Sequence, residues 1–213
     1  MSRSLNLSNS ELIEKSVANN ESELTHTGAL LALTGNRTGR SPKDRYIVEE
    51  SSTKDKIDWG EVNRPFDSNH FDKLWNKVSA YLDDKDHYVS NVHVGSNKDH
   101  YIPVEVKSEL AWHSLFSKLI FISPNDFNEE NKEVWKIITA ANYVCDPDED
   151  HTNSESCVII NFLRRKVLIA GMKYAGEIKK SMFAVQNFLL PEKGVLPMPV
   201  SYTHLTLPTN GTV

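Results

Sequence analysis

The stretch CVIINFLRRKVLIAGMKYAGEIKKSMFAVQNFLLP, residues 157–191, combines the strand-like and helix-like patterns that decide the fold. Two short apolar runs, 157–163 and 166–170, flank a pair of arginines and predict a β-hairpin. After a loop over 171–176, apolar residues recur at helical spacing and stop near a proline, which predicts a helix. The apolar face of this helix consists of Ile178, Met182, Val185 and Leu189. A strand pair followed directly by a helix favours an α/β protein.

The same alternation of patterns continues through the rest of the chain. A buried strand is predicted at 29–33, and further strands or strand-like patches at 46–48, 88–94, 102–106, 119–122 and 135–139. Pro103 favours an edge position or a strand start for the segment that contains it, because proline cannot donate to the ladder. We therefore expect a mixed β-sheet, with parallel and antiparallel neighbours.

Three more helices are predicted from capping residues that precede apolar periodicity. One follows the capping box Ser8–Glu11, and one follows Ser108. The third is capped by Asp67 and carries the clearest apolar face of the chain, formed by Phe71, Leu74, Trp75, Val78 and Leu82. The fold class expected is α/β, a single domain with a mixed β-sheet flanked by helices.

Composition narrows the classes of partner. The 213 residues include 24 basic and 29 acidic side chains, a net charge of −5, which gives no general attraction to nucleic acid or to an anionic membrane. Any anion site must therefore be local. No apolar run is long enough to span a bilayer, and the start lacks a secretory pattern. Cys145 and Cys157 form no Cys-x-x-Cys motif, so a reduced, cytoplasmic location is expected.

A first candidate anion site is the segment TGNRTGRSPKD, residues 34–44. Gly35 and Gly39 allow tight turns that can point backbone N–H groups at an anion. Arg40 offers a planar fork that suits a carboxylate or a phosphate. The spacing is not that of a Walker A loop, which is one residue longer and has lysine where Arg40 stands. The alternative interpretation is a surface turn with solvated cations.

A second candidate is YAGEIKK, residues 174–180. Tyr174 can donate a hydrogen bond from the loop, and the charge of Glu177 suits the helix start. Lys179 and Lys180 are adjacent cations in the first turn, where each disfavours the other and the helix dipole disfavours both. Both effects favour a neutral amine, which can act as a nucleophile, a base or a metal ligand. The alternative is a charged, solvated helix face.

Two further patterns do not predict a metal site. Asp146-x-Asp148-x-Asp150 begins like a calcium loop but has histidine where that loop needs glycine and Cys157 where it needs glutamate, so an acidic surface loop is expected. The histidines show no zinc-ligand spacing.

Taken together, four stretches of the chain resemble the N-terminal half of the ATP-dependent phosphoenolpyruvate carboxykinases. They are TGNRTGRSPKDRYIVEE, DWGEVNRPF, ELAWHSLFSKLIFI and KYAGEIKKSMFAVQNFLLPEKGVLPM, and the resemblance covers nearly all of positions 25–198. The first and last stretches, in this order, are specific to the ATP-using branch. The resemblance makes the two solvated-surface interpretations minor ones.

The resemblance implies an activity and assigns roles. Oxaloacetate would lose CO2, and the enolate would take the γ-phosphoryl group of ATP, giving phosphoenolpyruvate and ADP in gluconeogenesis. Mn2+ and Mg2+ (with ATP) are the implied cofactors. By position, Arg40 and Tyr174 are similar to substrate-binding residues. Lys180 is similar to the residue that ligates manganese and approaches substrate and γ-phosphate, and Lys179 would assist in catalysis.

The chain departs from the family pattern at its end. After Met198 the family continues with histidine, a second manganese ligand, where this chain has Pro199, and no nucleotide-binding loop follows. We therefore expect residues 1–198 to form an N-terminal substrate-side domain, 199–213 to be a non-native or disordered tail, and the chain to be inactive alone. The alternative is a natural short homologue, a non-catalytic module that binds dicarboxylates.

Overall fold

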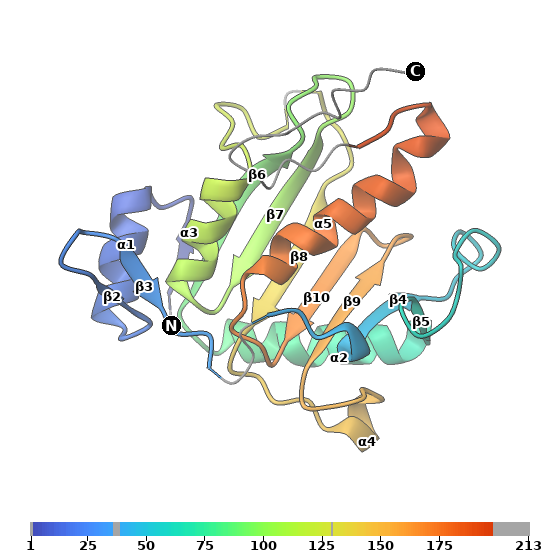
Figure 1. Ribbon diagram of the computed structural model, residues 1–213, viewed down its shortest axis with the longest axis horizontal. Helices are drawn as coiled ribbons and strands as arrows, with labels where there is room; N and C mark the ends of the chain where they lie inside the picture. The colour runs from blue at the N-terminus through green and yellow to red at the C-terminus, as the bar shows by residue number, and fades with distance from the viewer. Residues whose placement is uncertain (1, 36–38, 129, 198–213) are drawn as a thin grey trace, which may run out of the picture.

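A mixed eight-stranded sheet forms the centre of the molecule in the computed structural model, which describes residues 2–35, 39–128 and 130–197 (Figure 1). β10 runs parallel to β8 on one side and antiparallel to β9 on the other. In spatial order the strands are β1 (Arg3–Leu5), β6 (His87–Val94), β7 (Ile102–Ser108), β8 (Trp135–Ala140), β10 (Lys166–Ala170), β9 (Cys157–Asn161), β4 (Arg45–Val48) and β5 (Arg64–Phe66).

Helices cover both faces of this sheet. α5 (Gly176–Leu189) crosses one face, with α3 (Ala111–Ile120) beside it, and α2 (Ser68–Asp83) lies behind the opposite face (Figure 1). α1 (Asn9–Ala18) packs mainly on α3. The expected single α/β domain with a mixed sheet flanked by helices is thus confirmed.

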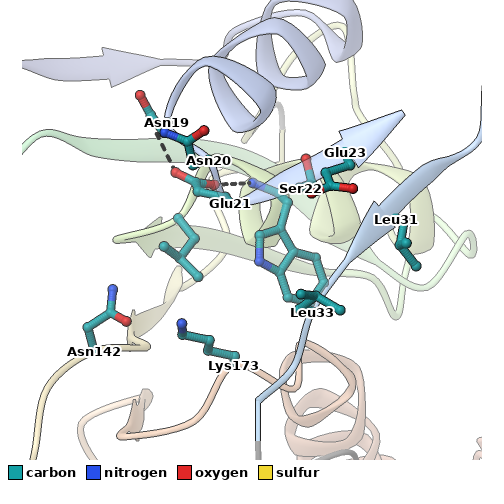
Figure 2. Close-up of a pocket in the computed structure, with 11 residues that line it drawn as sticks. Asn19, Asn20, Glu21, Ser22, Glu23, Leu31, Leu33, Asn142 and Lys173 are labelled. Atoms are coloured by element: carbon teal, nitrogen blue, oxygen red, sulfur yellow. Dashed lines mark hydrogen bonds between the residues drawn. The ribbon is translucent and has the colours of Figure 1, made fainter. Parts of the chain in front are cut away.

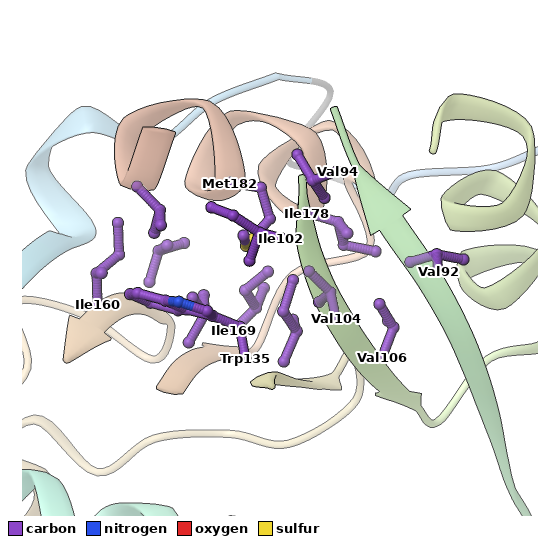
Figure 3. Packing of buried hydrophobic residues seen from close by; sticks show 14 of the residues in the cluster. Val92, Val94, Ile102, Val104, Val106, Trp135, Ile160, Ile169, Ile178 and Met182 are labelled. Atoms are coloured by element: carbon purple, nitrogen blue, oxygen red, sulfur yellow. The ribbon is translucent and has the colours of Figure 1, made fainter. Parts of the chain in front are cut away.

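Alternate residues of the central strands feed two separate hydrophobic clusters. In β10, Val167 and Ile169 join the cluster under α5, which Figure 3 shows, whereas Leu168 and Ala170 join the cluster under α2. All four side chains are at most 1% exposed. Burial on both faces explains why this strand is a continuous apolar run in the sequence. Burying each larger apolar side chain contributes about 1.5–3 kcal/mol.

The strongest periodic patterns of the sequence are confirmed. The hairpin of β9 and β10 and the two helices α2 and α5 form where they are predicted. All five residues of the predicted α2 face are buried, and Asp67 caps that helix by accepting the N–H groups of Asn69 and His70. Ser8 and Glu11 form the predicted capping box of α1.

The predicted strand at 29–33 forms, but it is not buried. β3 (Leu30–Ala32) pairs with β2 (Ser22–Leu24) in a separate two-stranded sheet. It therefore lies outside the main sheet, whose central strands are buried on both faces. Leu31 is 49% exposed and Leu33 is 73% exposed. The acidic segment 146–150 is also more ordered than a loop, because α4 (Pro147–Asp150) forms one turn capped by Asp146.

The prediction that Ser108 caps a helix is wrong. Ser108 is the last residue of β7 and its hydroxyl donates to the carbonyl of Leu110 at 3.0 Å. The N-terminus of α3 is instead capped from a distant segment, since Glu21 Oε2 accepts the Trp112 N–H at 3.2 Å. The strand-like patch at 119–122 is mostly the end of α3, and only Ile122 forms an isolated bridge, to His93.

Pro103 does not mark an edge strand. β7 lies inside the sheet, between β6 and β8. Pro103 is tolerated because it is the second residue of β7, ahead of Val104, where pairing with β8 begins. The strand-start alternative is therefore the correct one. No helix within the described residues is both long and apolar enough to cross a membrane.

Candidate active site

Strand register brings the two predicted motifs to the same end of the neighbouring strands β10, β9 and β4. Ala170, the last residue of β10, pairs with Cys157, the first residue of β9, and Arg45, the first of β4, pairs with Val158. The end of β10 and the start of β4 therefore lie on the same side of the sheet's strand ends. The chain enters β4 from Arg40 and leaves β10 toward α5, so both motifs meet there. Ligand sites in α/β proteins commonly lie beyond such strand ends.

A cavity of about 570 Å3 lies near these strand ends, between β3, α3 and the start of α5. Three of the four predicted site residues, Tyr174, Lys179 and Lys180, line it. All three are half-buried. Its remaining wall is mainly apolar and consists of Leu30, Leu31, Ala32, Thr34, Trp112, Leu115, Phe116, Leu119, Ile120, Ala175 and Gly176. The cavity thus pairs two amines and a phenol with a mainly apolar wall.

Arg40, the fourth predicted residue, lies next to the same helix turn without lining this cavity. Its Nε is 3.7 Å from Oε1 of Glu177, and Nε of Arg45 is 3.8 Å from Oε2 of the same carboxylate. The Glu177 side chain is fully buried, and burial raises its pKa despite the opposing effect of Arg40 and Lys180. One buried carboxylate therefore lies between two guanidinium groups.

The segment before β4 is fixed at its far end. Asp44, in the short 3-10 helix η1 (Pro42–Asp44), is buried and accepts a hydrogen bond from Ser154 Oγ at 2.8 Å. Gly35 has φ of +66°, the left-handed conformation that the predicted turn requires. Residues 36–38 of this motif lie outside the described residues. Gly35 thus has the backbone conformation that its place in the motif predicts.

His113 supports the loop that carries Tyr174. Its Nε2 donates to the carbonyl oxygen of Lys173 at 2.9 Å, so the neutral ring accepts the Thr139 hydroxyl at Nδ1, 3.1 Å away. Burial lowers the pKa of His113 to about 4. In the sequence, His113 is one of several scattered histidines without a ligand spacing. The carbonyl group that His113 contacts belongs to Lys173, one residue before the predicted substrate-binding Tyr174.

A second, more polar cavity of about 380 Å3 adjoins the first, and the two share Leu31 and Trp112. Figure 2 shows the side chains of Asn142 and Lys173 facing Glu21 across it. Glu21 is engaged structurally: it accepts Asn19 Nδ2 at 3.0 Å as well as the N-terminus of α3, and burial raises its pKa. None of the four predicted site residues lines this cavity.

The donor set for a metal is incomplete in the described part of the chain. No group of three or more His, Cys, Asp or Glu side chains gathers there that could hold a metal ion. Lys180 offers one nitrogen to the first cavity. A metal bound there would need further ligands. Position 199, where the family resemblance implies a second ligand, lies outside the described residues.

Sequence reasoning missed one part of the site, the pairing of Glu177 with Arg45. Glu177 was assigned only to the helix dipole, and Arg45 carried no signal of its own. The regular alternation Arg45-Tyr-Ile-Val48 places Arg45 at the first position of a strand, but only the pairing of β4 with β9 shows which helix it reaches.

Comparison with known proteins identifies the family of the chain. The family described as phosphoenolpyruvate carboxykinase matches residues 2–206. Proteins named phosphoenolpyruvate carboxykinase (ATP) from Geobacillus kaustophilus and Bacillus subtilis are 50% and 46% identical over 197 and 198 residues, which is 92% of this chain in each case. The chain spans only 37% and 38% of the length of these two relatives. By sequence and by extent of the match, the chain belongs to the phosphoenolpyruvate carboxykinase family.

Proposed function

We propose that this chain is the substrate-side domain, residues 1–198, of a phosphoenolpyruvate carboxykinase that uses ATP. In the reaction the C–C bond to the leaving carboxylate breaks and CO2 departs. The electron pair left behind forms an enolate of pyruvate. The enolate oxygen then takes the γ-phosphoryl group, and the bond to ADP breaks. The protein would act in the cytoplasm, in gluconeogenesis.

The observation that carries this proposal is the meeting of the two motifs at the N-terminus of α5. Tyr174, Lys179 and Lys180 line one cavity, and Arg40 reaches the same turn through Glu177. Oxaloacetate is a dianion, and the ends of these strands supply a guanidinium group, two lysine amines and a phenolic donor. A solvated surface would not bring them together from segments so distant in sequence.

The residues divide the work by chemistry. Arg40 and Tyr174 would bind substrate oxygens, since a guanidinium fork and a phenol are both hydrogen-bond donors. Lys180 would ligate the divalent metal as a neutral amine and approach the γ-phosphate, with Lys179 beside it. Bound Mn2+, with Mg2+ on ATP, would supply charge stabilisation for the enolate and the phosphates.

The chain alone should lack activity, because it spans little more than a third of its relatives. Phosphoryl transfer depends on positioning and on charge stabilisation, and half a site supplies neither fully. The decisive experiment joins residues 1–197 to the remaining segment of the Geobacillus kaustophilus relative. This chimera should convert oxaloacetate and ATP to phosphoenolpyruvate, whereas the 213-residue chain should not exceed the metal-only background.

Two results would contradict the proposal. A folded chimera that binds ATP but does not turn over would favour the alternative, a non-catalytic module that binds dicarboxylates. Turnover by the 213-residue chain that is lost in Lys180→Ala would show instead that the chain holds a complete site.

A further inference from the structure

We propose that Glu177 is a positioning residue for Arg40: its buried carboxylate holds the Nε edge of the guanidinium and so directs the two terminal nitrogens to the substrate. The inference rests on the proposed function only for the identity of the ligand. It assigns to Glu177 a role that helix stability does not require.

The contact geometry supports this assignment. Glu177 Oε1 faces Nε of Arg40 at 3.7 Å and Oε2 faces Nε of Arg45 at 3.8 Å. An arginine can present either the Nε edge or the pair of terminal nitrogens, and a bidentate carboxylate uses two of these donors side by side. Contact at Nε leaves the terminal pair of Arg40 for a second carboxylate. Arg40 is 40% exposed, so that pair can be reached from solvent.

Glu177 is a buried acidic residue surrounded by cations. The carboxylate is completely buried, and the backbone N–H of Ser41, the residue after Arg40, faces it as a hydrogen-bond donor. Burying an ionised carboxylate is costly unless cations and hydrogen bonds compensate. Here Arg40, Arg45 and Lys180 lie around it, and burial nevertheless raises its pKa. The Glu177 carboxylate, which is costly to bury, thus lies between the guanidinium groups of Arg40 and Arg45.

Glu177 also restricts the side chain of Arg40 before a ligand binds. Arg40 comes from a loop, and its side chain would otherwise lose rotamer freedom when a ligand binds. Glu177 belongs to the first turn of α5, and Arg45 is 17% exposed at the first position of β4. Tying Arg40 to a helix and a strand in advance removes part of that entropic cost.

Arginine modification by phenylglyoxal, read by mass spectrometry of peptides, tests the inference in the 213-residue chain without any activity. Glu177→Gln preserves shape and removes charge, so Arg40 should react about tenfold faster, the equivalent of 1.4 kcal/mol in its held population. Arg3 is the matched control. It is 58% exposed, belongs to the edge strand β1, and should react at the same rate in both proteins. An unchanged rate at Arg40 would overturn the inference.

A second variant covers the case in which Glu177→Gln does not fold, which faster reaction of Arg3 and Arg164 would reveal. Glu177→Asp keeps the charge and shortens the reach, so Arg40 should again react faster than in the original chain. If it does not, the inference fails. Oxalate, a stable dicarboxylate, distinguishes the two proposals. If oxalate does not slow the reaction of Arg40 with phenylglyoxal in the original chain, the substrate role of Arg40 fails. The role of Glu177 is judged separately, from the reaction rates without oxalate.

Discussion

The ring of Tyr174 lies against the α-carbon of Gly176, two residues further along the chain. A β-carbon at position 176 would be 2.5 Å from both Cε1 and Cζ of that ring and 2.6 Å from its hydroxyl oxygen. The φ of Gly176 is not in the left-handed range, so the glycine is needed for close approach rather than for an unusual backbone. Glycine at the first position of α5 thus sets where the phenol of Tyr174 stands in the cavity.

Gly176→Ala should move the Tyr174 ring without unfolding the domain. Alanine is the better helix former by about 0.5–1 kcal/mol, which offsets part of the steric cost. We expect shifted ring resonances of Tyr174 by NMR, and in the chimera a higher KM for oxaloacetate with little change for ATP. Gly60→Ala, where a β-carbon would meet nothing within 4 Å, is the control. Unmoved Tyr174 resonances would contradict the steric argument.

Arg40→Lys should weaken oxaloacetate binding in the chimera much more than ATP binding. A point charge does not replace a bidentate fork, and hydrogen bonds to charged groups contribute about 1.5–3 kcal/mol. Steady-state kinetics with each substrate varied in turn provides the measurement. If the KM for ATP rises and that for oxaloacetate does not, Arg40 belongs to the nucleotide side.

Lys180→Arg should abolish metal ligation by this residue and keep its positive charge, because arginine does not deprotonate in proteins. Manganese affinity of the chimera, followed by electron paramagnetic resonance, should fall sharply. Lys179→Arg is the matched control, one position away in the same cavity, and should lower the affinity less. Equal losses in the two variants would mean that the pair only supplies positive charge to bound anions.

His113 should make the fold sensitive to mild acid. Its pKa is lowered from 6.5 to about 4. Below pH 6.5 the unfolded chain therefore takes up a proton that the folded chain refuses until about pH 4. Stability from this group is fully present above the unfolded pKa and is lost as the pH falls through that window, by about 3 kcal/mol in total.

Urea unfolding at pH 7, 5 and 4 measures this dependence. His113→Gln keeps a donor and an acceptor but does not titrate, so its free energy of unfolding should fall less between pH 7 and pH 4 than that of the original chain. His26→Gln, at an exposed histidine, is the control for the change of residue type. Parallel pH profiles for the original chain and His113→Gln would refute the argument.

Local periodicity was enough to predict most of the fold. The face of α2 and the β9–β10 hairpin are encoded by residues that are neighbours in sequence, and both form as expected. Ser108 shows the limit of such reasoning. A serine before an apolar run is a good cap in general, but here the strand continues through Ser108 and Glu21, far away in sequence, caps α3 instead.

The candidate site divides in the same way. Tyr174, Lys179 and Lys180 belong to one short segment, and the structure places them in one cavity. The buried ion cluster at Glu177 could not be predicted, because it depends on the register of β4 against β9. The exposure of Leu31 was missed for a similar reason, since the sequence does not reveal that β3 leaves the main sheet.

The parallel pairing of β4 with β9 also bears on how the protein folds. The hairpin of β9 and β10 and the helix after it can form early, from contacts close in sequence, whereas β4 must close a loop of more than a hundred residues to reach β9. Arg40 and Arg45 come close to Glu177 only when β4 pairs with β9. Before that pairing, the Glu177 carboxylate lacks its two arginines, and anion binding by Arg40 would report that this long-range contact is complete.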